Sequence, residues 1–187
     1  MNSKLQIISG AYRGRKLALP QNARPTQNMA RGAVFNMLAT ILDVGDKITA
    51  WDTFGGSGAM GIEVLSRYGN SSVIFTDVSD ESIKVIKNNT ENIAANRVCI
   101  VRADAVAKIK NYAKCANLIF VDPPYENANV GIDFVTKLAR TVCPGTIVVQ
   151  EIEKVVPYSP DTTKWEVLRD KTYGRARFLI LRRNDNK

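Results

Sequence analysis

Four aspartates stand where short apolar runs of the sequence end, namely Asp52, Asp77, Asp104 and Asp122. Such runs, for example the four apolar residues before Asp122, are typical of strands buried on both faces of a parallel sheet. Ligands of open α/β sheets bind outside the carboxyl ends of the strands. The four carboxylates are therefore expected at one ligand crevice, where they could accept hydrogen bonds or orient a reacting amino group.

A glycine-rich loop follows Asp52 in the sequence WDTFGGSGAMG. Gly56, Gly58 and Gly61 match the pattern G-x-G-x-x-G, and Asp77 follows at about the 20-residue spacing of the dinucleotide fingerprint. Glycines allow positive φ and close backbone approach, and the helix that begins beyond them offers free N–H groups. The pattern favours a nucleotide-containing ligand, with a packing turn that holds no ligand as the alternative.

The position of Asp52 separates two classes of ligand. A carboxylate there would repel a pyrophosphate, whereas S-adenosylmethionine has no phosphate and carries an ammonium and a sulfonium. We therefore predict S-adenosylmethionine, with Asp77 accepting hydrogen bonds from the ribose and Asp104 from the adenine amino group. For each aspartate the alternative is a helix N-cap. The predicted donor site consists of Asp52, Phe54, Gly56, Ser57, Gly58, Asp77, Val78, Asp104 and Ala105.

The tetrapeptide D-P-P-Y follows the fourth apolar run and resembles the [DNS]-P-P-[YFW] motif of methyltransferases that act on exocyclic amino groups of bases. Such an amino group is a poor nucleophile because its lone pair is delocalised into the ring. Hydrogen bonds to the Asp122 carboxylate and the Pro123 carbonyl would favour a pyramidal nitrogen aimed at the methyl group. Pro124 fixes φ, and Tyr125 would stack on the base. These four residues are the predicted catalytic group.

Alternating elements position these residues. Strands are expected at 48–52, 72–77, 98–104, 118–122 and 146–152, with helices beginning near residues 57, 79, 105 and 129. This βαβ series predicts a parallel sheet with right-handed crossovers. Two further runs, 165–170 and 177–181, predict an antiparallel hairpin at the end of the sheet. A hairpin around GAYRG and a helix from Thr26 are expected to precede the series.

Composition excludes several classes of protein. The 187 residues, 45% apolar and 24% charged, fit one globular domain. No segment approaches the ~20 apolar residues of a membrane span, and the N-terminus shows no apolar signal core. Three cysteines without a CxxC pair favour a reducing cytoplasm. The absence of histidine excludes histidine-based acid–base catalysis and histidine-ligated metal sites, and no metal is expected.

The net charge of +8 is concentrated at the two ends. Residues 1–42 contain six Lys or Arg and no acid, and residues 169–187 contain seven against two, which leaves −3 for the residues between. Solubilising charge is one interpretation, and a phosphate-backbone footprint built from both ends is the one we favour. The predicted RNA-binding residues are Arg13, Arg15, Lys16, Arg24 and Arg31.

Over nearly its whole length the chain resembles the RsmD family of bacterial 16S ribosomal RNA guanine-N2 methyltransferases. The resemblance rests on ISGAYRGRKL, RPT with the later VFNML, DTFGGSGAMGIEVLSRYG, FVDPPY and a late YG. It implies a class I methyltransferase, Rossmann-like α/β fold: a seven-stranded, mostly parallel sheet with helices on both faces and a small N-terminal β-hairpin plus helix extension. It also implies S-adenosylmethionine as donor and one guanine of 16S rRNA as acceptor, in the small (30S) subunit or an assembly intermediate.

On this basis we expect a cytoplasmic monomer with a basic hairpin extension at 1–24 and a methyltransferase domain at 25–187. The chain departs from the family after Thr26, where Asn28 and Gly32 replace usual acids while Arg31 is kept, and at Gly55, where alanine is more usual. Alternatives are an adenine-N6 or another guanine-N2 nucleic-acid methyltransferase, a nucleotide-dependent oxidoreductase, and an RNA-binding module without activity.

Overall fold

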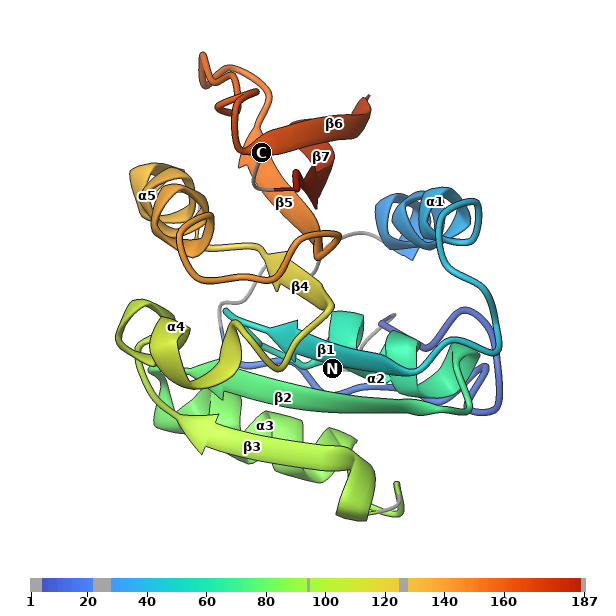
Figure 1. Cartoon of the computed structure of the whole chain (residues 1–187). Coiled ribbons are helices and arrows are strands. Elements are labelled where there is room, and N and C mark those ends of the chain that lie inside the picture. Colours follow the sequence, from blue (N-terminus) through green and yellow to red (C-terminus); the bar gives the residue numbers. More distant parts are fainter. Residues whose placement is uncertain (1–4, 22–27, 94, 125–127, 186–187) are drawn as a thin grey trace.

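The protein is built on one seven-stranded sheet with the strand order β3-β2-β1-β4-β5-β7-β6 (Figure 1). The computed structural model describes residues 5–21, 28–93, 95–124 and 128–185. The strands are β1 (Ile48–Asp52), β2 (Ser71–Asp77), β3 (Val98–Arg102), β4 (Leu118–Val121), β5 (Ile147–Glu153), β6 (Trp165–Tyr173) and β7 (Ala176–Arg183). The helices are α1 (Asn28–Leu38), α2 (Ala59–Arg67), α3 (Asp80–Asn89), α4 (Ala105–Tyr112) and α5 (Ala128–Leu138), with a 3₁₀ turn, η1, at Ala95–Arg97.

Strand direction fixes where ligands can reach the sheet. Strands β1 to β5 pair in parallel, so their carboxyl ends share one edge, while β7 pairs antiparallel with both β5 and β6. The predicted βαβ series, the terminal hairpin and the class I methyltransferase fold are thus confirmed. Strands β3 and β4 end earlier than expected, so Asp104 and Asp122 follow their strands and do not belong to them.

Helices cover both faces of the sheet, α1, α2 and α3 on one and α4 and α5 on the other (Figure 1). On the first face, Phe35 of α1 packs in one core with Phe75 and Phe120 of the sheet. On the second face, the core contains Trp51 of β1 and Phe134 of α5. Strands such as β4 are buried on both faces, which explains their uninterrupted apolar sequence. None of the helices in the described ranges is long and apolar enough to cross a bilayer.

The N-terminal segment 5–19 doubles back on itself through a single antiparallel bridge between Gln6 and Lys16. Its apolar residues Leu5, Ile7 and Leu17 are buried in the same core as α1 and α2. The predicted domain boundary at residue 24 lies outside the described residues. The segment is therefore packed into the main core, and a truncation would expose apolar surface there.

Candidate active site

The four aspartates lie along the carboxyl edge of the sheet. Asp52 and Asp77 are the last residues of β1 and β2, Asp104 comes two residues after β3, and Asp122 directly follows β4. Because these four strands are parallel and adjacent, the order along the edge is Asp104, Asp77, Asp52, Asp122. The structure thus brings together the residues on which the predicted donor and acceptor sites depend.

Asp52 is buried at this edge, with 4% of its surface exposed. Its Oδ2 accepts a hydrogen bond from the Gly61 N–H at 3.1 Å. Burial raises the pKa of Asp52 to about 7, the Gly61 hydrogen bond opposes the rise, and the charges of Asp122 and Asp77 add to it. A cation bound beside Asp52 would favour its ionised form. The site therefore suits a positively charged ligand better than a phosphate.

The glycine loop joins β1 to α2. Gly56 and Gly58 have φ of 53° and 75°, a region that favours glycine, and Gly58 is the N-cap of α2 without a side-chain cap. The third glycine of the motif has a packing role, because a Cβ on Gly61 would lie 2.3 Å from the Phe75 ring. Two of the three glycines thus shape the loop, and the third lets α2 approach β2.

Asp77 holds the loop in place. Its Oδ2 accepts a hydrogen bond from the Gly56 N–H and its Oδ1 one from the Ser79 N–H, both at 2.8 Å. The next residue, Val78, is 64% exposed, so its side chain is accessible to a ligand, and its predicted packing on the donor remains a prediction. Hydrogen bonds from a ribose to Asp77 remain a prediction, and an ionised carboxylate has acceptor capacity beyond two bonds.

The remaining predicted donor residues surround this edge. Asp104 N-caps α4 by accepting from the Val106 N–H at 2.9 Å, so the capping alternative applies to it, and its contact with adenine stays a prediction. Ala105 is buried behind it. Phe54 packs edge-on against Phe134 at 5.8 Å. The Ser57 carbonyl accepts from Asn89 at 2.8 Å, which ties the loop to α3.

Among the predicted catalytic residues, Asp122 is half-buried, Pro123 is buried and Pro124 is exposed, while Tyr125 lies outside the described residues. Pro123 is packed against α5, since a Cβ on Gly131 would lie 2.8 Å from its Cγ. Asp122 lines a small depression together with Met60, Phe120, Val149, Glu151 and Phe178. Glu151 of β5 is a buried acid at this site that the sequence analysis does not identify. The feature that could have pointed to it is an acidic residue within the mostly apolar run IVVQEIE.

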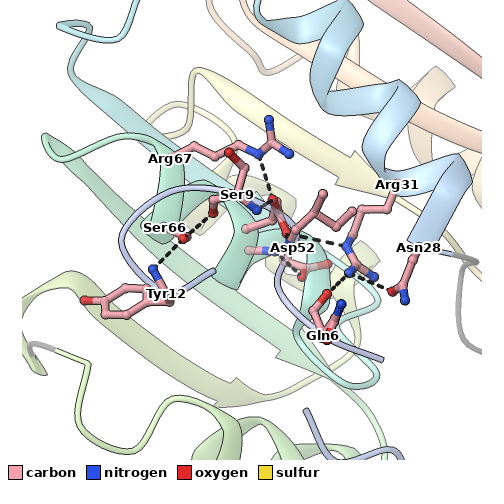
Figure 2. A network of polar contacts seen from close by, with 11 residues as sticks. Gln6, Ser9, Tyr12, Asn28, Arg31, Asp52, Ser66 and Arg67 are labelled. Atoms are coloured by element: carbon pink, nitrogen blue, oxygen red, sulfur yellow. Dashed lines mark hydrogen bonds and ion pairs between the residues drawn. The ribbon is translucent and has the colours of Figure 1, made fainter. Parts of the chain in front are cut away.

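Arg31 does not fit its predicted contact with RNA phosphate. Its side chain is fully buried, 3.7 Å from the Glu63 carboxylate, and its Nη2 donates to the Gln6 carbonyl and to Asn28 Oδ1. Figure 2 shows Arg31 reaching from α1 into this network, with Gln6 and Asn28 around its guanidinium. Glu63 binds the arginine in the interior, so the side chain is unavailable to a surface ligand.

Among the other N-terminal candidates, Arg13 lies away from Asp122. Arg13 is exposed in a turn whose Ala11 N–H donates to the Ser66 carbonyl at the end of α2, and Arg15 donates to the Glu91 carbonyl just after α3. Helix α2 runs back from the carboxyl edge and ends at the amino edge of the sheet, opposite Asp122, whereas the last residue of α3, Asn89, contacts the glycine loop. Lys16 is exposed on the segment after this turn, and Arg24 lies outside the described residues.

Three exposed basic side chains at the carboxyl edge belong to the last strands of the sheet and the turns beside them. Lys154 follows β5, Lys171 lies near the end of β6, and Arg175 is in the turn between β6 and β7; all three are exposed. The Lys154 N–H donates to the Arg175 carbonyl at 2.8 Å, and Arg175 is paired with Glu153. The charge distribution in the sequence indicates a basic C-terminal region. The sheet topology adds that these three residues lie at the carboxyl edge of the sheet, where Asp122 also lies.

Comparison with known proteins gives a consistent result. The family described as Conserved hypothetical protein 95 matches residues 5–182. Ribosomal RNA small subunit methyltransferase D of Escherichia coli K12 is 29% identical, with 97% of this chain and 91% of the relative covered. The solved yhhF protein of Escherichia coli is 27% identical with a TM-score of 0.81, covering 97% of this chain and 99% of that one.

A more distant structure shares the fold. An RNA methyltransferase from Salinibacter ruber, solved in complex with S-adenosyl-L-homocysteine, is 17% identical with a TM-score of 0.65 and covers 88% of this chain and 96% of its own. The near-complete match to the family, and the near-complete overlap with its Escherichia coli relative, agree with the resemblance seen in the sequence. The chain belongs to the Conserved hypothetical protein 95 family, the RsmD family of methyltransferases.

Proposed function

We propose that this protein transfers a methyl group from S-adenosylmethionine to the exocyclic N2 amino group of one guanine in 16S rRNA. The acceptor would be the small (30S) ribosomal subunit or an assembly intermediate of it. The observation that carries the proposal is the position of Asp122 and Pro123 directly after β4, on the edge where Asp52 and Asp77 end β1 and β2. Membership of the RsmD family, with a small-subunit RNA methyltransferase as relative, supports the choice of RNA.

The residues of the carboxyl edge fit the predicted donor. Asp52, whose pKa is raised by burial, would be stabilised in its charged form by the donor's cationic groups. Gly56 and Gly58 keep the loop free of side chains where the ligand would approach, and Asp77 would accept from the ribose. When bound, S-adenosylmethionine supplies a methyl group carried on a positively charged sulfur.

Asp122 and Pro123 would prepare the acceptor. The Asp122 carboxylate and the Pro123 carbonyl would accept hydrogen bonds from the two N–H bonds of the amino group, which would direct the nitrogen lone pair away from both acceptors. In the transfer, the amino nitrogen would gain a bond to the methyl carbon as the bond from that carbon to sulfur breaks, and the nitrogen would then lose one proton. Asp122 would receive that proton, because it would be the acceptor of the N–H hydrogen bond.

The test separates the acceptor role from the donor role with two matched substitutions. Asp122→Ala should lower the single-turnover methylation rate about 10²-fold, by analogy with the loss of one preorganised polar contact, and leave donor affinity nearly intact. Asp77→Ala should weaken donor binding by about 1.5–3 kcal/mol, the scale of a hydrogen bond to a charged group. Calorimetry gives donor affinity, and small subunits that lack the methyl mark give the rate at saturating donor.

Asp122→Asn refines the test, because it keeps an acceptor oxygen. It should retain more activity than Asp122→Ala if orientation dominates, and little more if charge or proton removal matters. The modified nucleoside must be identified in each assay. Wild-type rates in Asp122→Ala, methyl groups on adenine N6, or tight binding of a nicotinamide dinucleotide would each refute the proposal.

A further inference from the structure

We infer that Glu151 reads the ring N1–H of the target guanine and thereby sets the choice of guanine over adenine. The inference rests on the proposed function and adds a specificity residue to it. Glu151 lies in β5 and lines the same depression as Asp122. A base held by Asp122 would therefore bring its Watson–Crick edge close to Glu151.

The register of the sheet puts the two acids side by side. Val121 and Gln150 are the last paired residues of β4 and β5, so Asp122 and Glu151 are the next residues on two parallel neighbours. Adjacent strands are about 4.8 Å apart. Both side chains belong to the face of the sheet that carries Phe120 and Val149, since side chains alternate along a strand. A base lying across the ends of β4 and β5 would meet both carboxylates.

The chemistry of the two purines explains why a second acid suits guanine. The Watson–Crick edge of guanine offers N1–H and the 2-amino group, both donors, whereas adenine presents an acceptor at N1 beside its 6-amino group. An ionised carboxylate only accepts hydrogen bonds. Asp122 and Pro123 would hold the amino group of either base, but Glu151 would pair with guanine N1–H and repel the N1 lone pair of adenine.

The surroundings of Glu151 make this discrimination effective. Glu151 is only 7% exposed, and Phe178 is its direct partner in β7. Met60 and Val149 complete the apolar wall around the two acids. Polar interactions gain strength where water is excluded, and a mismatched lone pair costs more there. Sites built to bind a substrate N–H can reject analogues that lack it by several orders of magnitude.

The decisive substrate is 2-aminopurine, which keeps the 2-amino group of guanine but has an acceptor at N1. Small subunits are reconstituted with either base at the target position. The wild-type protein should methylate guanine about 10²-fold or more faster than 2-aminopurine. Glu151→Gln should reduce this preference to about tenfold or less, because its amide can donate to the N1 acceptor as well as accept from N1–H.

Glu153→Gln is the matched control. It makes the same chemical change two residues further along β5, where the carboxylate pairs with Arg175, and it should keep the wild-type preference. Thermal unfolding and donor affinity show whether each variant is folded. A structural role for Glu151 would lower both rates equally and leave their ratio unchanged.

The outcomes separate this inference from the proposed function. Equal rates on both bases with the wild-type protein would overturn the reading of N1–H, whatever the behaviour of the variant. A wild-type preference that survives in a folded Glu151→Gln protein would overturn the assignment to Glu151. Absence of methyl transfer to guanine N2 by the wild-type protein would overturn the proposed function itself.

Discussion

The guanidinium of Arg31 lies 3.7 Å from the carboxylate of Glu63, and both side chains are fully buried. Glu63 also accepts hydrogen bonds from the Ile8 and Ser9 N–H groups and from Arg67 Nε, at 2.9, 3.0 and 2.7 Å. Burial lowers the pKa of Arg31, and the charge of Glu63 opposes that change. One carboxylate of α2 thus connects α1 and the N-terminal segment.

The first prediction is that this carboxylate is structural. Glu63→Ala should lower the free energy of unfolding by about 3–5 kcal/mol, because it leaves the charge of Arg31 buried without its partner. Chemical denaturation measures the loss. Glu166→Ala is the control: it removes an exposed pair with Arg182 at 3.3 Å and should cost less than about 1 kcal/mol. Similar losses in the two variants would contradict the prediction.

Arg31 shows why charge counts mislead at the level of single residues. Its place in a basic terminal region predicts a contact with RNA phosphate. Yet it stands three and four positions before Val34 and Phe35, on the apolar stripe of α1. That spacing indicates burial, and Glu63 likewise lies among the apolar residues of α2. The helical spacing in the sequence therefore indicates that Arg31 and Glu63 are buried. Only the tertiary structure shows that the two side chains pair with each other.

The aspartates could be placed from the sequence because each ends an apolar run, and parallel strands align their carboxyl ends. The role of Glu151 could not. In β5, which is buried on both faces, the period of two does not tell which face a side chain joins. Only the register of β5 against β4 and β7 shows that Glu151 lies beside Asp122. The side chain of the preceding residue, Gln150, is buried, and its amide has no hydrogen-bond partner among the described residues.

The second prediction concerns pH and Asp52. The folded protein holds the proton of Asp52 more tightly than the unfolded chain, since burial raises the pKa from its usual value to about 7. Its stabilising contribution is complete below pH ~4 and is lost as pH rises to about 7, with a slope of about 1.4 kcal/mol per pH unit. In Asp52→Asn this loss should disappear, as measured by denaturation between pH 4 and 8.

Donor binding should show the complementary pH dependence. A cationic ligand favours ionised Asp52, so binding below pH ~7 must release a proton, and affinity should rise with pH up to about 7 and then level off. Asp52→Asn, which cannot titrate, should bind with an affinity independent of pH over this range. A wild-type affinity that is flat from pH 5 to 8 would mean that the donor cation does not interact with Asp52.

The third prediction assigns different RNA contacts to the two edges of the sheet. Lys171 of β6 is exposed and lies opposite Phe178 in the neighbouring strand β7. On its other side, Phe178 lies opposite Glu151 of β5. Arg13 is exposed at the opposite edge. On a short RNA fragment that carries the target guanine, Lys171→Ala should reduce the slope of log affinity against log salt by about 0.7–0.9, the value for one phosphate contact. Arg13→Ala should leave that slope unchanged.

A contact between RNA and Arg13 should be detected only with the whole small subunit as ligand, because only a large RNA can extend from Asp122 around to the turn that carries Arg13. With the subunit as ligand, Arg13→Ala should lower the slope by about the same 0.7–0.9 as Lys171→Ala. Lys137→Ala is the control, since Lys137 is exposed in the last turn of α5, on the other face of the sheet. An unchanged slope for Arg13→Ala with both ligands would make the basic N-terminus solvated surface, and the RNA footprint would then belong to the carboxyl edge.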